Sequence, residues 1–184
     1  VIGTVGGGKF DFANPDPSDM SIDRIAHSLS NQCRFTGHTR EFYSIAQHSV
    51  YVSLLCPPPM KMWGLLHDAH EFAVGDNSSP FKAYMESVAP GVVRELENRI
   101  DEAIRQRVSA FLEDWMFTSE ALRTVKENDY KMLFWERDWL LPDTAYLYPD
   151  ELDPSMHPGG CILQVDPMAR PWTPEEARQA FLRQ

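Results

Sequence analysis

The chain is poor in cysteine, and the spacing of its few cysteines excludes two kinds of site. Its 184 residues include three, Cys33, Cys56 and Cys161, and none of them belongs to a Cys-x-x-Cys pair. Disulfide frameworks use even sets of cysteines, and all-thiolate zinc sites use closely spaced pairs. We therefore expect neither, and a reducing compartment such as the cytoplasm fits this composition.

Long apolar runs are also missing. No apolar stretch approaches the roughly 20 residues that span a bilayer. Residues 1–10 are rich in glycine and lack the basic and apolar regions of a secretory signal peptide. We therefore expect a protein that has no membrane partner.

An excess of basic residues is absent too. Lys and Arg number 17 against 27 Asp and Glu, which gives a formal net charge of -10. The phosphate backbones of nucleic acids bind surfaces rich in Lys and Arg, so a chain this acidic is a poor partner for nucleic-acid polymers. A small anion is not excluded, because a local group of Lys and Arg can bind one phosphate on an acidic protein.

Alternating strand patterns and internal repeats are absent, whereas helical patterns recur along the chain. Val92, Leu96, Ile100 and Ile104, for example, follow the period of one helix face. The length and the 43% of hydrophobic residues suffice for one domain with its own core. We expect an all-α fold with helices at residues 21–30, 40–55, 60–72, 81–87, 91–112 and 118–141.

Capping and breaking residues set the expected boundaries. Three consecutive prolines from Pro57 end the second helix, and Gly75 ends the third. Thr173 begins a last helix, with Glu176 placed for a capping box. The expected organisation is an irregular segment at 1–18 and one helical domain at 19–184, in which 142–172 wraps the surface and 173–184 forms a terminal helix.

The sharpest local signal is His67-Asp68, followed by Glu71, in the third expected helix. An imidazole and a carboxylate next to each other on a helix can both reach a cation beside its axis, and such ligands suit divalent ions. Glu71 lies three residues after Asp68, so it returns to roughly the same face and could move a proton. An isolated His-Asp pair is nevertheless common, and the two side chains could simply pair with each other.

Two further residues support a metal site. His48 and Asp129 each lie among apolar residues in an expected helix. A buried His or Asp is costly unless it is paired or binds a cation. We therefore expect His48, His67, Asp68 and Asp129, from three helices, to hold one divalent cation. The mixed nitrogen and oxygen set favours Zn, Co, Mn, Ni or Fe over calcium.

The order of these residues resembles the metal signature of the HD superfamily of phosphohydrolases. The similarity covers about residues 11–141, and the matching segments are Ala26–Asn31, Arg34–Phe35, Gly37–Thr39, Tyr43–Ser49, Leu65–Glu71, Gly75–Asp76, Pro80–Lys82 and Glu136–Asp138. The chain is similar to the small branch that holds bacterial 5'-deoxynucleotidases and bacteriophage dATP triphosphohydrolases. This resemblance implies a helical bundle with the metal between helices, a deoxynucleotide substrate and, for a phage-encoded chain, the host cytoplasm.

The resemblance also implies residues that bind substrate. Arg34 resembles a phosphate clamp, Phe35 a ring that faces the nucleoside, and Asp76 an acceptor for a sugar hydroxyl. Lys82 and Lys126 could each reach a phosphate. All of these residues except Arg34 have a structural alternative. Phe35, whose position holds Trp in many relatives, could simply pack in the core. Asp76 could belong to a turn, and the two lysines could be solvated.

The implied reaction is direct hydrolysis, in which Glu71 moves a proton and Arg34 neutralises phosphate charge. The chain has no Gly-rich Walker loop. Two reactions stay open: 5'-nucleotidase on a monophosphate, and triphosphohydrolase on dATP or another dNTP. A second cation could accompany the substrate, with Glu71 and Asp76 as its only clear further ligands. A non-catalytic nucleotide- or metal-binding module is the alternative from a different class, although such a module has no need of Glu71.

We also expect a homo-oligomer, at least a dimer. Aromatic residues are frequent in the C-terminal half, and one bundle of this size should leave some of them for a subunit contact. The small members of the HD superfamily are usually oligomeric, which points the same way. The aromatic residues in question are Trp115, Phe117, Phe134, Trp135, Trp139, Tyr146 and Tyr148. The sequence gives no role to His27, His38 or His70.

Overall fold

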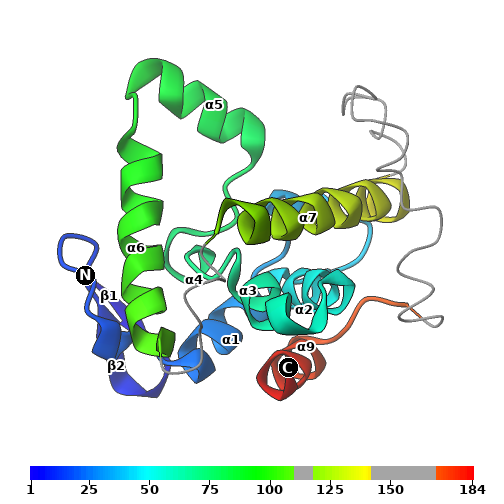
Figure 1. Cartoon of the computed structure of the whole chain (residues 1–184), viewed down its shortest axis with the longest axis horizontal. Helices are drawn as coiled ribbons and strands as arrows, with labels where there is room; N and C mark the ends of the chain where they lie inside the picture. The colour runs from blue at the N-terminus through cyan, green and yellow to red at the C-terminus, as the bar shows by residue number, and fades with distance from the viewer. Residues whose placement is uncertain (110–117, 142–168) are drawn as a thin grey trace.

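The computed structural model describes residues 1–109, 118–141 and 169–184, and this part of the chain is mostly helical (Figure 1). The all-α prediction is therefore confirmed. The elements are β1 (Ile2–Thr4), β2 (Gly8–Phe10), α1 (Ile22–Asn31), α2 (Ile45–Leu55), α3 (Lys61–Leu66), α4 (Glu71–Val74), α5 (Ser79–Val88), α6 (Val92–Val108), α7 (Ser119–Leu140) and α9 (Pro174–Arg183). None of the helices in these described ranges combines the length and apolar character needed to cross a membrane.

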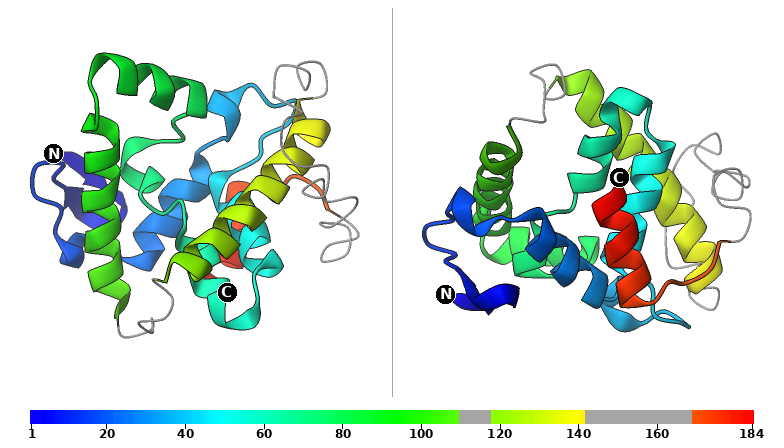
Figure 2. Two further views of the ribbon diagram at one scale, coloured as in Figure 1. Left: turned by 45° about the horizontal axis from the view of Figure 1, so that its top comes forward. Right: turned by 90° about the horizontal axis from the view of Figure 1, so that it is seen from below.

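Helix α2 forms the centre of the described fold. Every residue from Ile45 to Ser53 is buried, and α1, α3, α7 and α9 all pack against this helix (Figures 1 and 2). Polar residues on a helix that is covered on every side must find partners inside the protein, because water cannot reach them. This requirement applies to His48 and to its neighbour Gln47.

Two hydrophobic clusters flank α2. The first lies among α1, α2, α6 and α9 and includes Ile25, Leu29, Ile100 and Phe181. The second lies mainly between α2 and α7, and its buried members are Tyr43, Tyr51, Val52, Cys56, Val125, Met132 and Leu140. Burial of apolar surface on both sides fixes α2 relative to α7. These two helices carry the polar residues His48, Lys126, Asp129 and Glu136, which are discussed below.

The second helix begins later than predicted. Residues 40–44 are not helical, and α2 starts at Ile45. Ser44 has an extended backbone that bridges to Cys33, and its hydroxyl accepts a hydrogen bond from the Gln47 N–H at 3.1 Å. A serine that caps the helix in this way sets its first turn. The predicted start at residue 40 is therefore wrong.

The predicted continuous helix at 60–72 is also wrong, because it breaks into α3 and α4. In the intervening turn the N–H of Ala69 donates to the Leu66 carbonyl oxygen at 3.0 Å, and the N–H of Glu71 donates to the Asp68 carbonyl oxygen at 3.0 Å. These bonds span three residues instead of four, so the backbone is wound more tightly than in an α-helix. The His67-Asp68 pair consequently lies in a turn between two helices.

Other predicted boundaries are confirmed. Ser21, Thr118 and Thr173 cap α1, α7 and α9 through their hydroxyl groups, and the capping box with Glu176 is present. Gly75 ends α4 with a φ of 80°, which glycine adopts without strain. The predicted helices at 81–87 and 91–112 correspond to α5 and α6, with residues 110–112 outside the described part. Most of the segment 142–172 also lies outside it.

The N-terminal segment is more regular than predicted. β1 and β2 pair antiparallel, with Ile2 opposite Phe10, and Gly6 and Gly7 turn the chain at φ values of 73° and 75°. Phe10 is fully buried, and its ring meets that of Phe72 edge to face, with centroids 5.2 Å apart. Packing of this one ring thus anchors a hairpin whose strands are too short to give an alternating pattern.

Candidate metal centre

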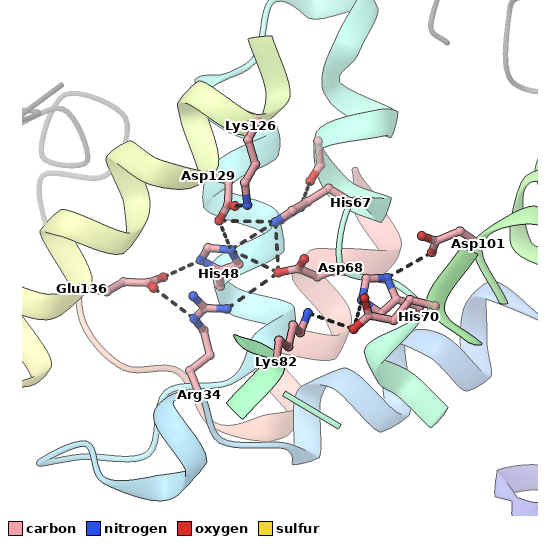
Figure 3. A network of polar contacts seen from close by, with 12 residues as sticks. Arg34, His48, His67, Asp68, His70, Lys82, Asp101, Lys126, Asp129 and Glu136 are labelled. Atoms are coloured by element: carbon pink, nitrogen blue, oxygen red, sulfur yellow. Dashed lines mark hydrogen bonds and ion pairs between the residues drawn. The ribbon is translucent and has the colours of Figure 1, made fainter. Parts of the chain in front are cut away.

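Three segments bring four ligand side chains together. His48 comes from α2, His67 and Asp68 come from the turn between α3 and α4, and Asp129 comes from α7 (Figure 3). One nitrogen or oxygen atom from each lies within 4.8 Å of the others. The structure therefore gathers the whole predicted ligand set into one largely buried cluster that could hold a metal ion.

The separations within this cluster fit a coordination shell. The Nε2 atoms of His48 and His67 are 3.2 Å apart. The Nε2 atom of His48 lies 3.3 Å from Asp129 Oδ1, and that of His67 lies 3.1 Å from Asp68 Oδ2. Tetrahedral bonds of 2.0–2.1 Å would place ligand atoms about 3.3 Å apart. The His48–Asp68 and His67–Asp129 atom pairs are slightly wider, at 3.6 and 3.7 Å, so the four side chains converge to about the spacing that one cation requires.

Both imidazoles are oriented by acceptors on their far side. The Nδ1 atom of His48 lies 2.7 Å from Glu136 Oε1, and that of His67 lies 2.7 Å from the Gly64 carbonyl oxygen. An acceptor at Nδ1 keeps the proton there and leaves the Nε2 lone pair for a metal. Glu136 is fully buried. Glu136 has no predicted role, although it stands seven residues after Asp129 and so shares its helix face.

The titration of the four groups reflects their mutual charges. Burial disfavours the charged form of each, yet Asp68 and Asp129 raise the pKa of His67 well above its usual value, and Glu136 and Asp129 raise that of His48. Burial likewise opposes ionisation of the two aspartates, but the imidazoles lower the pKa of Asp68 and of Asp129. The cluster thus binds positive charge, which protons supply when no metal ion does.

The cluster is open to solvent on one side. The His48 side chain has no exposed surface, whereas those of Asp68 and Asp129 are 20% and 13% exposed. A catalytic metal needs an open position for water or substrate. The exposed edges of Asp68 and Asp129 provide that approach.

Arg34 lies beside the ligands. Its buried guanidinium donates from Nε to Glu136 Oε2 at 3.0 Å, and Nη1 lies 3.7 Å from Asp68 Oδ2. Although burial alone would lower the pKa of Arg34, Glu136, Asp76 and Asp68 raise it. Arg34, the predicted phosphate clamp, therefore lies beside the ligand cluster, and Glu136 contacts both Arg34 and His48.

Phe35 and Asp76 form a pair of their own. The Phe35 N–H donates to Asp76 Oδ2 at 2.9 Å. Phe35 and Thr36 both have left-handed backbones, with φ values of 54° and 56°, which is uncommon for residues other than glycine. One oxygen of Asp76 therefore stabilises a strained turn at Phe35 and Thr36, which is a different turn from the one after Gly75 that was its predicted structural alternative.

Glu71 is a second buried carboxyl group beside the ligands, in addition to Glu136. A side-chain oxygen of Glu71 lies within 4.8 Å of one of Asp68, and Oε2 has no hydrogen-bond partner in the described part of the chain. Burial, followed by the charges of Asp68 and Asp76, raises the pKa of Glu71 well above its usual value. Glu71 accordingly favours its protonated form beside the cluster.

The two lysines are paired with carboxylates. Lys82 Nζ lies 2.9 Å from Glu97, and Lys126 Nζ lies 2.6 Å from Asp129 Oδ2. Each lysine therefore lies near the cluster, but neither is simply solvated. The predicted role for Lys82 and Lys126 requires a phosphate to share them with these partners.

His27 and His38 are exposed, whereas His70 is buried. His70 Nδ1 lies 3.1 Å from Asp101, and Nε2 lies 3.7 Å from Glu97. Both partners belong to α6, which no local pattern in the sequence connects to His70.

The chain is similar to two bacterial proteins. It is 36% identical over 148 residues to the uncharacterized protein YfdR of Escherichia coli K12, a match that covers 80% of this chain and 76% of YfdR. The chain belongs to the YfdR family. A second relative, an uncharacterized protein of Rhodobacter capsulatus, is 36% identical over 110 residues, which is 55% of this chain and 54% of the relative. No family model matches the chain. Both relatives are uncharacterized, so they assign no activity to this chain.

Proposed function

We propose that this member of the YfdR family is a divalent-metal-dependent phosphohydrolase that acts on deoxynucleotides. The main observation in its support is a pair of buried groups beside the ligand cluster. The Arg34 guanidinium and the Glu71 carboxyl group both lie next to Asp68. A site that only stored a metal would need neither group. The order of the ligands, with its resemblance to the HD superfamily, supports the same assignment.

His48, His67, Asp68 and Asp129 would hold the cation. Their nitrogen and oxygen atoms suit Zn, Co, Mn, Ni or Fe, and the 3.1–3.3 Å separations already described support such an ion. A bound cation supplies Lewis acidity toward water and toward a phosphoryl oxygen. The remaining steps fall to the side chains around it.

Arg34 would bind the substrate phosphate. Its Nε atom is used by Glu136, which directs the terminal amino groups of the guanidinium toward the cluster. A guanidinium fork matches phosphate oxygens and offsets the charge that shifts between them during transfer. Because Glu136 also orients His48, phosphate and cation would be held in a fixed relation to each other.

Glu71 would donate a proton to the leaving oxygen. The raised pKa described above supports a protonated carboxyl group, and a protonated acid can give a proton but cannot take one. Glu71 lies next to Asp68, on the buried side of the cluster. Of the proton-transfer roles open to Glu71, donation agrees best with this environment.

Phe35 would read the sugar. The Asp76 carboxylate fixes the strained Phe35 backbone at 2.9 Å, and the Arg34 guanidinium lies 5.5 Å from the centroid of the Phe35 ring. An aromatic ring beside the phosphate-binding arginine is placed to pack against a nucleoside and to crowd a 2'-hydroxyl. Strained turns are commonly maintained at functional sites, which supports a role in recognition.

The test combines metal analysis with a substrate screen. Purified protein would be assayed for metal content and for release of phosphate or tripolyphosphate from deoxy- and ribonucleoside mono-, di- and triphosphates, before and after chelation. His67→Ala should lose metal and turnover, whereas His38→Ala, which removes an exposed imidazole, should lose neither. The product separates the 5'-nucleotidase from the triphosphohydrolase.

Three outcomes would contradict the proposal. Activity and metal content that survive chelation would remove the metal from the mechanism. Metal binding without turnover on any nucleotide would identify a binding module instead of an enzyme. Equal rates on deoxy- and ribonucleotides would exclude sugar reading by Phe35.

A further inference from the structure

Helix α4, which begins at Glu71, is too short to be stable by itself. It has four residues, and its end is closed by the Gly75 N–H, which donates to the Glu71 carbonyl oxygen at 2.9 Å. A single helical turn is unstable in water, because it fixes several residues for one hydrogen bond. The position of Glu71 therefore depends on contacts that neighbouring elements make with α4.

Two side chains at the end of α1 supply such contacts. Gln32 Nε2 donates to the Glu71 carbonyl oxygen at 3.1 Å, and the Ser28 hydroxyl donates to the Phe72 carbonyl oxygen at 2.8 Å. Gln32 Nε2 also donates to Ser28 Oγ at 2.9 Å. One connected set of hydrogen bonds thus joins the first two carbonyl groups of α4 to α1.

The orientation of the Gln32 amide follows from its partners. A carbonyl oxygen can only accept a hydrogen bond, and the Ser28 hydroxyl uses its single proton on Phe72. Both partners of the amide therefore need a donor, which is its nitrogen with two protons. Methionine resembles glutamine in length but has no N–H group, so Gln32→Met would remove both bonds and keep most of the volume.

The backbone of Gln32 is fixed independently of its side chain. Its carbonyl oxygen accepts from the N–H of Ile45, the first residue of α2, at 3.1 Å. Two residues later, the Arg34 N–H donates to the Tyr43 carbonyl oxygen at 2.9 Å. Both bonds belong to an antiparallel bridge between this segment and the residues that lead into α2, so the amide is attached to a rigid support.

Gln32 consequently joins two parts of the site whose relative position matters. Its carbonyl group binds the start of α2, which carries the candidate ligand His48, and its amide group binds α4 at Glu71. Removal of the amide group would free α4 at its Glu71 end, while the Gln32 carbonyl group would still hold α2. The two effects can therefore be separated by one substitution.

We propose that Gln32 is a positioning residue, which acts through the Glu71 backbone to hold the Glu71 carboxyl group beside the ligand cluster. The inference rests on the proposed function, since that function makes Glu71 the proton donor. A displaced acid slows proton transfer but leaves the contact between the substrate phosphate and Arg34 unchanged. Loss of the Gln32 amide should therefore lower kcat and leave KM near its wild-type value.

The test compares two neighbouring amides. Gln32→Met removes the bond to Glu71, whereas Asn31→Ala removes an amide that donates to the His27 carbonyl oxygen within α1. We expect Gln32→Met to lower kcat by roughly 10–100-fold while KM changes by less than about twofold. Asn31→Ala should keep both constants. The metal content of both variants, measured on the same samples, should equal that of the wild-type protein.

Hydrogen exchange provides a measurement that needs no substrate. The Gly75 N–H donates to the same Glu71 carbonyl oxygen that the Gln32 amide binds. Its exchange with solvent should therefore be faster in Gln32→Met than in Asn31→Ala, by about tenfold or more. Ser28→Ala, which removes the bond to α4 from the neighbouring hydroxyl, covers the case in which Gln32→Met does not fold and should give the same pattern with smaller changes.

The outcomes distinguish this inference from the proposed function. No turnover in the wild-type protein would contradict the proposed function, and the Gly75 exchange would still report whether Gln32 holds α4. Equal exchange in Gln32→Met and Asn31→Ala would overturn the inference. In an active protein, an unchanged kcat in Gln32→Met, or a lower kcat that comes with loss of metal, would overturn it as well.

Discussion

The Oε1 atom of Glu136 lies 2.7 Å from Nδ1 of His48, and neither side chain has any exposed surface. Replacing the charged acceptor weakens the basicity and the orientation of the imidazole, so Glu136→Gln should lower metal affinity by roughly 10–100-fold. Competition with a metallochromic chelator would measure the change. Glu127→Gln, on an exposed face of the same helix, is the matched control. Equal affinities of the two variants would refute the orienting role.

Asp68 and Glu71 should separate metal binding from turnover. Asp68→Ala removes a ligand and should abolish tight metal binding together with activity. Glu71→Gln keeps the shape of the side chain but cannot donate the same proton, so the rate should fall by about 100- to 10,000-fold while the metal ion stays bound. Metal content and steady-state rates measured on one preparation would decide. A near-normal rate in Glu71→Gln would remove Glu71 from the mechanism.

Metal affinity should depend on pH. A histidine must be neutral to bind a metal ion. The raised pKa of His67 means that this imidazole keeps its second proton to a higher pH than a free imidazole does. The apparent affinity should therefore fall as the pH drops through this raised pKa, by up to about tenfold per pH unit for each proton displaced. Calorimetry in buffers of different ionisation enthalpy would count the protons. Binding that releases none would contradict this prediction.

Gly64 should tolerate no side chain. A Cβ there would lie 2.8 Å from Cys56 Sγ and 3.1 Å from the Ser53 Cα atom on α2. Gly64→Ala should therefore cost about 1–3 kcal/mol in the free energy of unfolding, because α3 must move away from α2. Chemical denaturation would measure it, with Gly3→Ala as the control, since a Cβ at Gly3 meets nothing within 4 Å. Identical midpoints would mean that the two helices separate at no cost.

The oligomer remains a prediction. Phe134 is buried, whereas Trp135 and Trp139 are partly buried, pack against each other with centroids 4.4 Å apart and contact the second hydrophobic cluster of their own chain. The other aromatic residues behind the prediction, Trp115, Phe117, Tyr146 and Tyr148, lie outside the described residues. Light scattering at micromolar concentration, with and without metal, should give at least a dimer. A monomer under both conditions would rule out the predicted assembly.

The sequence predicted helices best where an end carries its own chemical mark. Ser21, Thr118 and Thr173 cap as expected because a hydroxyl group acts on the two or three residues that follow it. The sequence does not predict the break between α3 and α4, because Ala69 and Phe72 continue the helical spacing of Leu65 and Leu66. Bonds that span three residues tighten the backbone there without leaving any mark in that pattern.

In the candidate site, the ligands were predictable and their supporting contacts were not. His48, His67, Asp68 and Asp129 stand out because such side chains are costly among apolar neighbours. Glu136 resembles an ordinary helical glutamate until α7 packs on α2. The α6 partners of His70 depend on tertiary contacts that no local pattern encodes. Asp76 was expected to face a sugar, and its contact with the Phe35 N–H could not be read from spacing.

Helix α7 carries both Asp129 and Glu136, and the latter reaches a histidine 88 positions earlier in the chain. An ion held by His48 and Asp129 would therefore act as a crosslink between distant parts of the sequence, closing a long loop as a disulfide does. The unfolded chain cannot gather these ligands, so the free energy of binding adds to the stability of the fold. Metal supply would then govern how long the protein survives in a cell as well as whether it works.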